Sequence, residues 1–109
     1  MTDRTAILDD LFAVIESRKG ADPDTSYTAS LFAKGRNKIA QKVGEESVET
    51  ILAATTETKA DLVNESADLL YHLLVLWADS GVVPEDVWQT LAKRFGLSGI
   101  DEKSSRNQS

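Results

Sequence analysis

The sequence predicts an all-α protein of four to five helices, built on an antiparallel helical hairpin. Apolar residues recur at three- and four-residue steps through most of the 109 residues, which is the spacing of amphipathic helices. No segment alternates apolar and polar residues in the way that a half-buried strand does. A chain of this length favours one domain, so we expect a single helical domain over residues 1–95 and a polar tail over residues 96–109.

The first third of the chain predicts one helix and a less regular segment. A helix is expected at about residues 5–18, where five apolar residues lie on one side: Ile7, Leu8, Leu11, Phe12 and Ile15. Gly20 and Pro23 then break the pattern and predict a loop. Residues 26–35, SYTASLFAKG, predict an irregular stretch with a short helical turn around Leu31.

The predicted hairpin consists of helices at about residues 36–55 and 59–78. The apolar side of the first helix is formed by Ile39, Val43, Ile51 and Leu52. Thr58 precedes Asp61 by three residues, which is the spacing of a capping box at a helix start. The second helix contains the apolar run LLYHLLVLW, so we expect it to be the most buried element. The short turn between the two helices makes them antiparallel neighbours.

Glycine and proline positions predict how the chain ends. Gly81 suits the end of the second hairpin helix, and Pro84 suits the first turn of a further helix that ends near Phe95. Residues 96–109 are polar, and we expect a ligand or a partner to order them. Because a chain of this size buries only a modest core, we expect pairing with a second copy to complete the fold.

Composition excludes several kinds of site. The absence of cysteine excludes disulfides, thiol nucleophiles and thiolate zinc sites, and a single histidine excludes sites with several imidazoles. The net charge of -6 argues against DNA or RNA as a partner. No apolar run approaches the ~20 residues that span a bilayer, and no leader precedes the first helix, so we expect a cytoplasmic protein without a membrane segment. Oxygen ligands would favour Mg²⁺, Mn²⁺ or Ca²⁺ over softer ions.

Five acidic residues of the hairpin are spaced so that they share its faces. Glu46 and Glu49 are three residues apart, as are Glu65 and Asp68, and Glu45 is four residues before Glu49. Both acidic groups lie roughly two turns from the connection of the hairpin, so they fall at similar heights on facing helices. We therefore expect four or five carboxylates to meet across the hairpin.

Two interpretations of these carboxylates are open. Charged residues at this spacing are most often a solvated helix face. Glu65 and Asp68, however, interrupt the most apolar helix, where unpaired acids are rare. Like charges a few ångströms apart raise one another's pKa values, and a divalent cation relieves that cost. We favour a magnesium-type site, in which the ion keeps several waters and bridges to substrate phosphates.

The lysines that precede the glutamates continue the same helical stripe. Lys38 and Lys42 stand at the intervals that lead to Glu45, Glu46 and Glu49. They could form ordinary ion pairs within the helix, or they could bind phosphates while a metal ion occupies the acidic end. We favour phosphate contact if the metal site exists.

Three further features each have two interpretations. His72 lies four residues after Asp68 and could extend the metal face, but a hydrogen-bonded core histidine is favoured. Trp77 and Trp88 are favoured as core or dimer contacts over base-stacking platforms. The Ser-Tyr-Thr residues 26–28 are expected in a loop, and their hydroxyls could also contact a ligand.

Three separated motifs resemble one enzyme family. SYTASLFAKGRNKIAQKVGEESVETILAA, ESADLLYHLLVLW and SGIDEKSSR occur in order between residues 26 and 106, and together they resemble phosphoribosyl-ATP pyrophosphohydrolases. The broader resemblance is to the MazG-like all-α nucleoside-triphosphate pyrophosphatases, which share ExxE followed by ExxD. It implies a MazG-like fold and a Mg²⁺-dependent cytoplasmic homodimer or higher assembly. The implied reaction is hydrolysis of phosphoribosyl-ATP to phosphoribosyl-AMP and pyrophosphate, the second step of L-histidine biosynthesis.

The resemblance also implies roles for particular residues. The metal-binding signature is matched by Glu46, Glu49, Glu65 and Asp68. Phosphate or substrate contact is expected for Lys38, Lys42, Lys103 and Arg106. We expect direct attack by water, with Glu46 and Glu49 at the catalytic centre and Mn²⁺ as a possible substitute for Mg²⁺. Glu45, the acid that remains after the four ligands, is the candidate for orienting or deprotonating the water.

Two rival functions remain open at this point. One is a house-cleaning pyrophosphatase of the same superfamily that acts on dUTP or damaged nucleotides. The other is a non-catalytic acidic helical module that binds a partner helix, for which Mg²⁺ should change neither stability nor nucleotide turnover.

Overall fold

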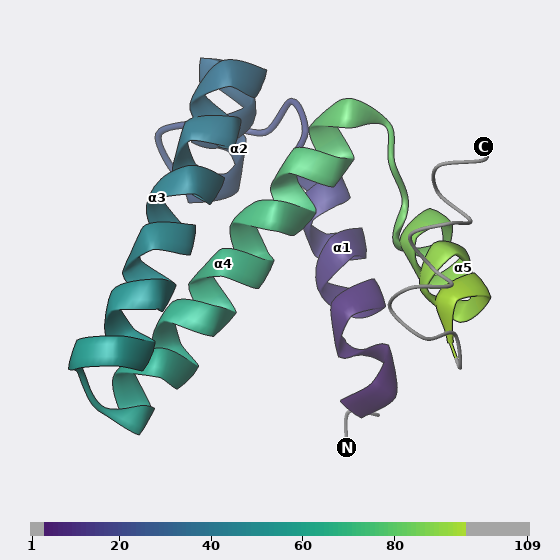
Figure 1. The fold of residues 1–109 in the computed structure, drawn as a ribbon. Helices are drawn as coiled ribbons and strands as arrows, with labels where there is room; N and C mark the ends of the chain where they lie inside the picture. Colours follow the sequence, from purple (N-terminus) through teal and green to yellow (C-terminus); the bar gives the residue numbers. More distant parts are fainter. Residues whose placement is uncertain (1–3, 96–109) are drawn as a thin grey trace.

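The computed structural model describes residues 4–95 of the chain, and within them it is entirely helical (Figure 1). A short 3₁₀ turn at Arg4–Ala6 leads into five α-helices. Their bounds are α1 Ile7–Ser17, α2 Tyr27–Lys34, α3 Arg36–Thr56, α4 Lys59–Ser80 and α5 Pro84–Arg94. The predicted all-α class and the number of helices are therefore confirmed.

The central feature is the antiparallel hairpin of α3 and α4 (Figure 1). The predicted capping box forms at the start of α4, where the Thr58 hydroxyl accepts a hydrogen bond from the Asp61 amide at 3.1 Å. The Asp61 carboxylate in turn accepts one from the Thr58 amide at 3.2 Å. These bonds satisfy amides that would otherwise lack partners at the helix start, so the position of the turn is encoded locally.

The segment expected to be irregular is instead a regular helix, α2. The Ser26 hydroxyl accepts a hydrogen bond from the Ala29 amide at 3.1 Å, so Ser26 is the N-cap of this helix. Tyr27 and Thr28, expected in a loop, form its first turn. Gly35, with φ of 95° and ψ of 172°, ends α2 and directly precedes α3, a conformation that side-chain-bearing residues rarely adopt.

The hydrophobic core lies at the end of the hairpin where α3 begins and α4 ends. It is formed by Phe12, Ile15, Leu31, Ile39, Leu74, Val75 and Ala78. Two cationic side chains bind the last residues of α4 at the same end of the hairpin. The Lys19 ammonium donates to the Ala78 carbonyl at 2.7 Å, and the Arg36 guanidinium donates to the Asp79 carboxylate at 3.0 Å. This end is therefore covered by α1 and α2 and held by polar contacts.

The other end of the hairpin corrects one expectation. Ile51 and Leu52 were expected on the apolar side of α3, but they are 61% and 48% exposed. Helix α4 has more buried residues than any other helix of residues 4–95, as expected, but they begin only at His72. The reason is that α1 and α2 pack on the first half of α3 and the last half of α4, whereas at the other end α3 and α4 bury only the side chains that face one another, such as Ala53.

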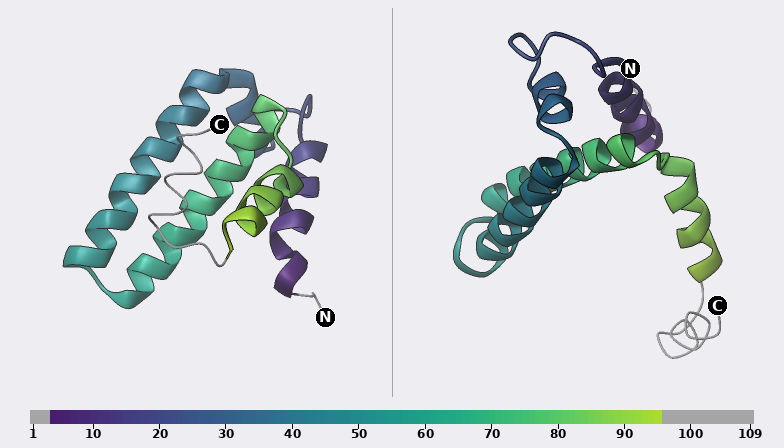
Figure 2. Two further views of the ribbon diagram at one scale, coloured as in Figure 1. Left: turned by 45° about the vertical axis from the view of Figure 1, so that its right-hand side comes forward. Right: turned by 90° about the horizontal axis from the view of Figure 1, so that it is seen from above.

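Helix α5 projects away from the hairpin (Figure 2). It touches the rest of the protein through the Trp88 indole, which donates to the Asp9 carboxylate at 3.2 Å and meets the Trp77 ring edge-to-face with centroids 6.1 Å apart. This agrees with the interpretation of both tryptophans as packing residues. No helix within residues 4–95 is both long and apolar enough to span a membrane.

Candidate metal centre

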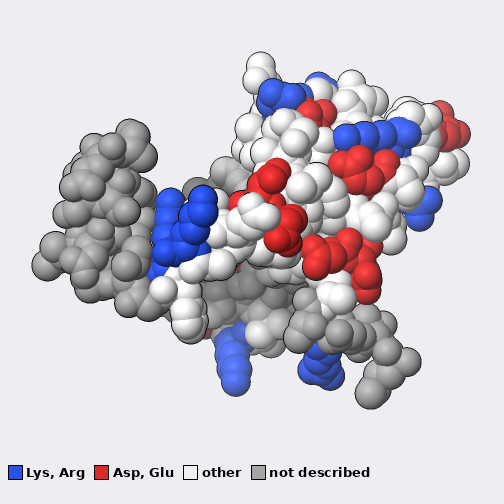
Figure 3. Space-filling model, turned by 90° about the vertical axis from the view of Figure 1, so that its right-hand side faces the viewer, with Lys and Arg blue, Asp and Glu red and all other residues white. Residues whose placement is uncertain are grey.

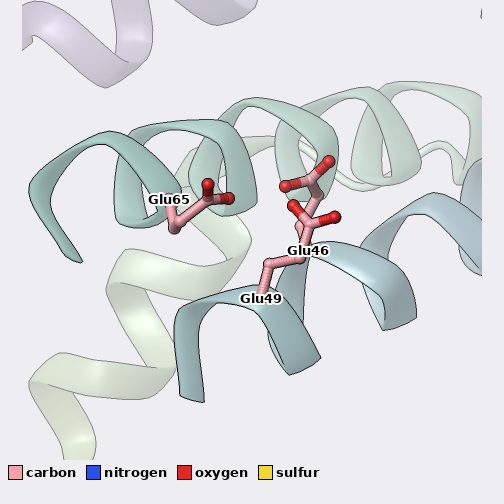
Figure 4. Close-up of side chains that lie close together, drawn as sticks. All are labelled: Glu46, Glu49 and Glu65. Atoms are coloured by element: carbon pink, nitrogen blue, oxygen red, sulfur yellow. The ribbon is translucent and has the colours of Figure 1, made fainter. Parts of the chain in front are cut away.

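Three of the predicted acidic ligands meet on the hairpin. Glu46 and Glu49 of α3 and Glu65 of α4 each offer one carboxylate oxygen, and these oxygens all lie within 4.8 Å of one another (Figure 4). The Thr50 hydroxyl aligns the two helices at this height, since it lies 2.7 Å from the carbonyl oxygen of Glu46 and 3.3 Å from that of Glu65. We call Glu46, Glu49 and Glu65 the carboxylate cluster.

The electrostatics of the carboxylate cluster are unfavourable when it is fully ionised. A hydrogen bond with Glu49, then burial, then the negative charges nearby raise the pKa of Glu65 from 4.5 to about 7. Burial and the same neighbour raise the pKa of Glu46. A hydrogen bond between two carboxyl groups requires a proton on one of them, so the cluster without a cation holds a proton to higher pH than isolated carboxyl groups do.

Two oxygen atoms of the carboxylate cluster are buried without a hydrogen-bond partner. They are Oε2 of Glu46 and Oε2 of Glu65. A buried hydrogen-bond acceptor without a partner lowers the free energy of unfolding. A cation or a proton bound to such a carboxylate oxygen would remove that loss. Hard divalent cations such as Mg²⁺ take carboxylate oxygens as ligands and fill their remaining positions with water and substrate phosphate. The residues present therefore fit a magnesium-type ion.

Asp68, the predicted fourth ligand, lies near the carboxylate cluster but not within it. Its negative charge raises the pKa values of Glu46 and Glu65, while its side chain is exposed and is not among the oxygens that lie within 4.8 Å of one another. Asp68 is one turn after Glu65 on the same face of α4. Its role as a ligand remains a prediction.

Glu45 points toward a different set of partners. Its carboxylate accepts a hydrogen bond from the Gln41 amide at 2.8 Å and pairs with the Lys42 ammonium at 3.6 Å. The Gln41 hydrogen bond, followed by the charges of Lys42 and Lys38, lowers the pKa of Glu45. The structure thus places Glu45 with the two predicted phosphate-binding lysines, and its predicted role toward water remains a prediction.

The face of the molecule on the side of α5 carries acidic and basic side chains in alternating patches (Figure 3). No continuous basic surface extends across the part of this face that the structure describes. The remaining predicted substrate contacts, Lys103 and Arg106, lie outside the described residues.

The sequence analysis did not predict the hydrogen-bonded network that lies next to the carboxylate cluster. His72 is buried and bonds to the Asp68 carbonyl oxygen through Nδ1 and to the Tyr27 hydroxyl through Nε2, each at 2.8 Å. The Tyr71 hydroxyl bonds to the buried Thr28 hydroxyl. The interpretation of His72 as a hydrogen-bonded core residue is confirmed. The signal that could have placed Tyr27 and Thr28 against α4 is Ser26, because it is the N-cap of the helix in which these two residues form the first turn.

Comparisons with known proteins agree with the motifs and the geometry. The family model described as phosphoribosyl-ATP pyrophosphohydrolase matches residues 8–95. A phosphoribosyl-ATP pyrophosphatase from Paramagnetospirillum magneticum is 66% identical over 106 residues, covering 97% of each chain. One from Azospirillum brasilense is 61% identical over 93% of this chain and 91% of its own, and one from Trichlorobacter lovleyi is 52% identical over 99% of this chain and 100% of its own.

Proposed function

The chain belongs to the phosphoribosyl-ATP pyrophosphohydrolase family, and we infer that it hydrolyses phosphoribosyl-ATP to phosphoribosyl-AMP and pyrophosphate, the second step of L-histidine biosynthesis. The observation that carries this inference is the carboxylate cluster, whose two unpartnered buried oxygens lie inside the matched region of the chain. A solvated helix face would leave its carboxylate oxygens in contact with water. The cluster is therefore better explained as a site than as a surface.

The ligands of the ion are Glu46, Glu49 and Glu65, joined by Asp68 when its exposed side chain turns inward. When bound, a magnesium or manganese ion would neutralise charge on the phosphates and on the leaving pyrophosphate. Three or four carboxylates leave coordination positions for water and phosphate, which agrees with how magnesium is held in enzymes that act on nucleotides.

The lysines of α3 bind the phosphate chain beside the ion. Lys42, Glu46 and Glu49 follow one another at four and three residues, so they lie on one stripe of α3. Lys42 is paired with the exposed Glu45 at 3.6 Å, a contact weak enough to be exchanged for phosphate. Lys38 lies one turn earlier on the same stripe, and Lys103 and Arg106 complete the predicted set of phosphate contacts.

Water is the nucleophile, since the hydrolysis needs no covalent intermediate. Glu45 remains the proposed group for orienting or deprotonating this water, on condition that it releases Gln41 and Lys42. The lowered pKa of Glu45 makes it a weaker base, so orientation of the water is the larger part of its role.

A second copy of the chain completes the fold. Val48, Ile51 and Leu52 form an exposed apolar stripe on α3, and Val63 and Leu70 form one on α4. Exposed apolar stripes on two adjacent helices mark an interface, and a homodimer or higher homo-oligomer buries them.

The cytoplasmic location remains a prediction.

The test of this function is a substrate panel with and without Mg²⁺. The wild-type chain should release pyrophosphate from phosphoribosyl-ATP in the presence of Mg²⁺, with kcat/KM at least tenfold above that for dUTP and the common dNTPs. Excess EDTA should abolish turnover, and Mg²⁺ or Mn²⁺ should restore it. Faster turnover of dUTP would indicate a house-cleaning pyrophosphatase, and no turnover of any nucleotide would indicate a binding module.

A further inference from the structure

Tyr27 is half exposed, yet its side chain is fixed on three sides. It remains 52% exposed. Its ring stacks on Tyr71 with centroids 6.3 Å apart and meets the edge of His72 at 5.8 Å. Its hydroxyl is held by His72 Nε2 at 2.8 Å. A surface side chain with this many contacts is pre-organised, so a ligand that touches it has little conformational entropy to remove.

The hydrogen-bond partners of His72 decide which way the proton of Tyr27 points. Nδ1 of His72 faces the carbonyl oxygen of Asp68, which can only accept, so Nδ1 carries the hydrogen. A neutral imidazole has one N–H, and Nε2 is therefore an acceptor. With His72 in this neutral tautomer, the Tyr27 hydroxyl donates to Nε2 and presents its oxygen lone pairs to a ligand.

Tyr27 lies beside the site that holds the carboxylate cluster. Glu65, Asp68 and His72 are separated by three and four residues, so they share one face of α4. Seven residues of helix separate Glu65 from His72, which is about 10 Å along the axis. The charges of Lys42 and Glu46 on α3 and of Asp68 on α4 all act on the Tyr27 hydroxyl, so it lies near charged groups of both hairpin helices.

We propose that Tyr27 is a substrate-contacting residue whose hydroxyl oxygen accepts a hydrogen bond from a hydroxyl or amino group of the sugar or base portions of phosphoribosyl-ATP. The proposal rests on the proposed function and adds a contact to it. Phosphate oxygens are excluded as partners because they are acceptors at neutral pH and the proton of Tyr27 is already committed to His72. His72 is then a positioning residue, which orients the hydroxyl and links it to the turn of α4 that carries Asp68.

The experiment compares Tyr27→Phe with Tyr71→Phe. Each removes one hydroxyl from the same network, but the Tyr71 hydroxyl is bonded to the buried Thr28 hydroxyl. Loss of one hydrogen bond to substrate should raise the KM for phosphoribosyl-ATP about three- to tenfold in Tyr27→Phe, with a smaller change in kcat. The inhibition constant of pyrophosphate should stay within twofold of the wild type. Tyr71→Phe should leave both constants within twofold, although it lowers the melting temperature.

Three results would overturn the proposal. An unchanged KM in a folded Tyr27→Phe variant would show that the hydroxyl does not touch substrate. An equal rise in the inhibition constant of pyrophosphate would place the hydroxyl at the phosphates or at a water on the ion. An equal rise of KM in Tyr71→Phe would show that the network acts only through stability.

A second variant covers the case in which Tyr27→Phe fails to fold because it leaves Nε2 of buried His72 without a donor. Tyr27→Phe combined with His72→Leu removes both partners and should show the same rise in KM. An unchanged KM in this folded double variant would overturn the proposal as well. A wild-type chain that does not hydrolyse phosphoribosyl-ATP would end the proposed function itself, and the two failures are therefore distinguishable.

Discussion

The two ends of the α3–α4 hairpin contain similar apolar residues but have different neighbours. At the end covered by α1 and α2, Ile39, Leu74 and Val75 are at most 1% exposed. At the other end, Ile51 is 61% and Val63 is 59% exposed, and the carboxylate cluster lies between the two ends. We call these the closed end and the open end. The comparison indicates that the closed end contains the buried core of the single chain, while the open end leaves apolar side chains exposed, which is where we propose that a second copy binds.

The largest effect is expected on the free energy of unfolding, when a leucine is replaced by alanine at the closed end and, for comparison, at the open end. Leu74→Ala at the closed end should lower the free energy of unfolding by about 2–5 kcal/mol, because it leaves a cavity among residues that cannot relax fully. Leu52→Ala at the open end removes the same atoms from a side chain that is 48% exposed. In dilute protein it should cost about 0.5 kcal/mol or less. Urea denaturation of both variants measures the difference, and equal losses at low concentration would contradict the comparison.

The next effect concerns the carboxylate cluster. Glu46→Gln keeps the shape of the side chain but removes the charge that an ion requires, and it should lower kcat/KM for phosphoribosyl-ATP about 100-fold or more. Glu57→Gln is the matched control, because Glu57 is exposed at the end of α3 near the hairpin turn. Pyrophosphate release at saturating Mg²⁺ measures both variants. Full activity of Glu46→Gln would remove Glu46 from the mechanism.

A smaller effect is expected for self-association at the open end. Ile51→Glu places a charge on the most exposed apolar stripe, and it should weaken the dimer about tenfold or more because the charge would lie in an interface without a partner. Analytical ultracentrifugation over a range of concentrations measures the dissociation constant. Val14→Glu is the control, since Val14 is also exposed but lies on α1. A wild-type chain that stays monomeric at every concentration would show that no second copy covers the stripe.

The smallest expected effect is the pH dependence of stability in the absence of divalent ions. The pKa of Glu65 is about 7 in the folded chain and about 4.5 when free, so the folded state binds more protons than the unfolded state between these values. The free energy of unfolding should therefore fall as the pH rises from about 4.5 to about 7. Because a bound ion favours the ionised carboxylates, Mg²⁺ should raise the melting temperature more at pH 8 than at pH 5.

The control for this pH dependence is Glu65→Gln, which should flatten the slope without Mg²⁺. Thermal melts at both pH values, with and without the ion, give the measurement. If stability rose with pH in the wild type over this window, the protonated cluster would not exist in the folded chain.

The hairpin could be predicted from sequence because its signals are local. Thr58 and Asp61 define the turn by their spacing alone, and the positions of Glu46, Glu49 and Glu65 follow from helical geometry once the turn is fixed. The full set of four ligands did not follow in the same way. An exposed carboxylate such as Asp68 has several rotamers open to it, and its spacing does not choose among them.

Other features depended on information that the sequence pattern does not contain. Helix α2 is only eight residues long, so its periodicity is weak, and its start depends on one hydroxyl, that of Ser26. The exposure of Ile51 could not be predicted because an apolar stripe indicates burial but not whether the same chain or another one provides the cover. The partners of Glu45 were missed because its spacing allows pairing with Gln41 and Lys42 on the same helix as well as a position beside the other acids.

Gly35 is the single residue between α2 and α3, and its φ is 95°. No atom lies within 4 Å of the position that a Cβ would occupy there, so the positive φ and not a lack of space is what favours glycine. The angle between α2 and α3 thus combines the positive φ of Gly35 with the packing of Leu31 against the core. Tyr27 is on α2, and Lys42, Glu46 and Glu49 are on α3, so the backbone at Gly35 joins the helix of the proposed sugar or base contact to the helix of the proposed phosphate and metal contacts. A residue that forced φ to a negative value would turn α2 away from the hairpin and separate Tyr27 from His72 and Tyr71, while Glu46, Glu49 and Glu65 would stay together.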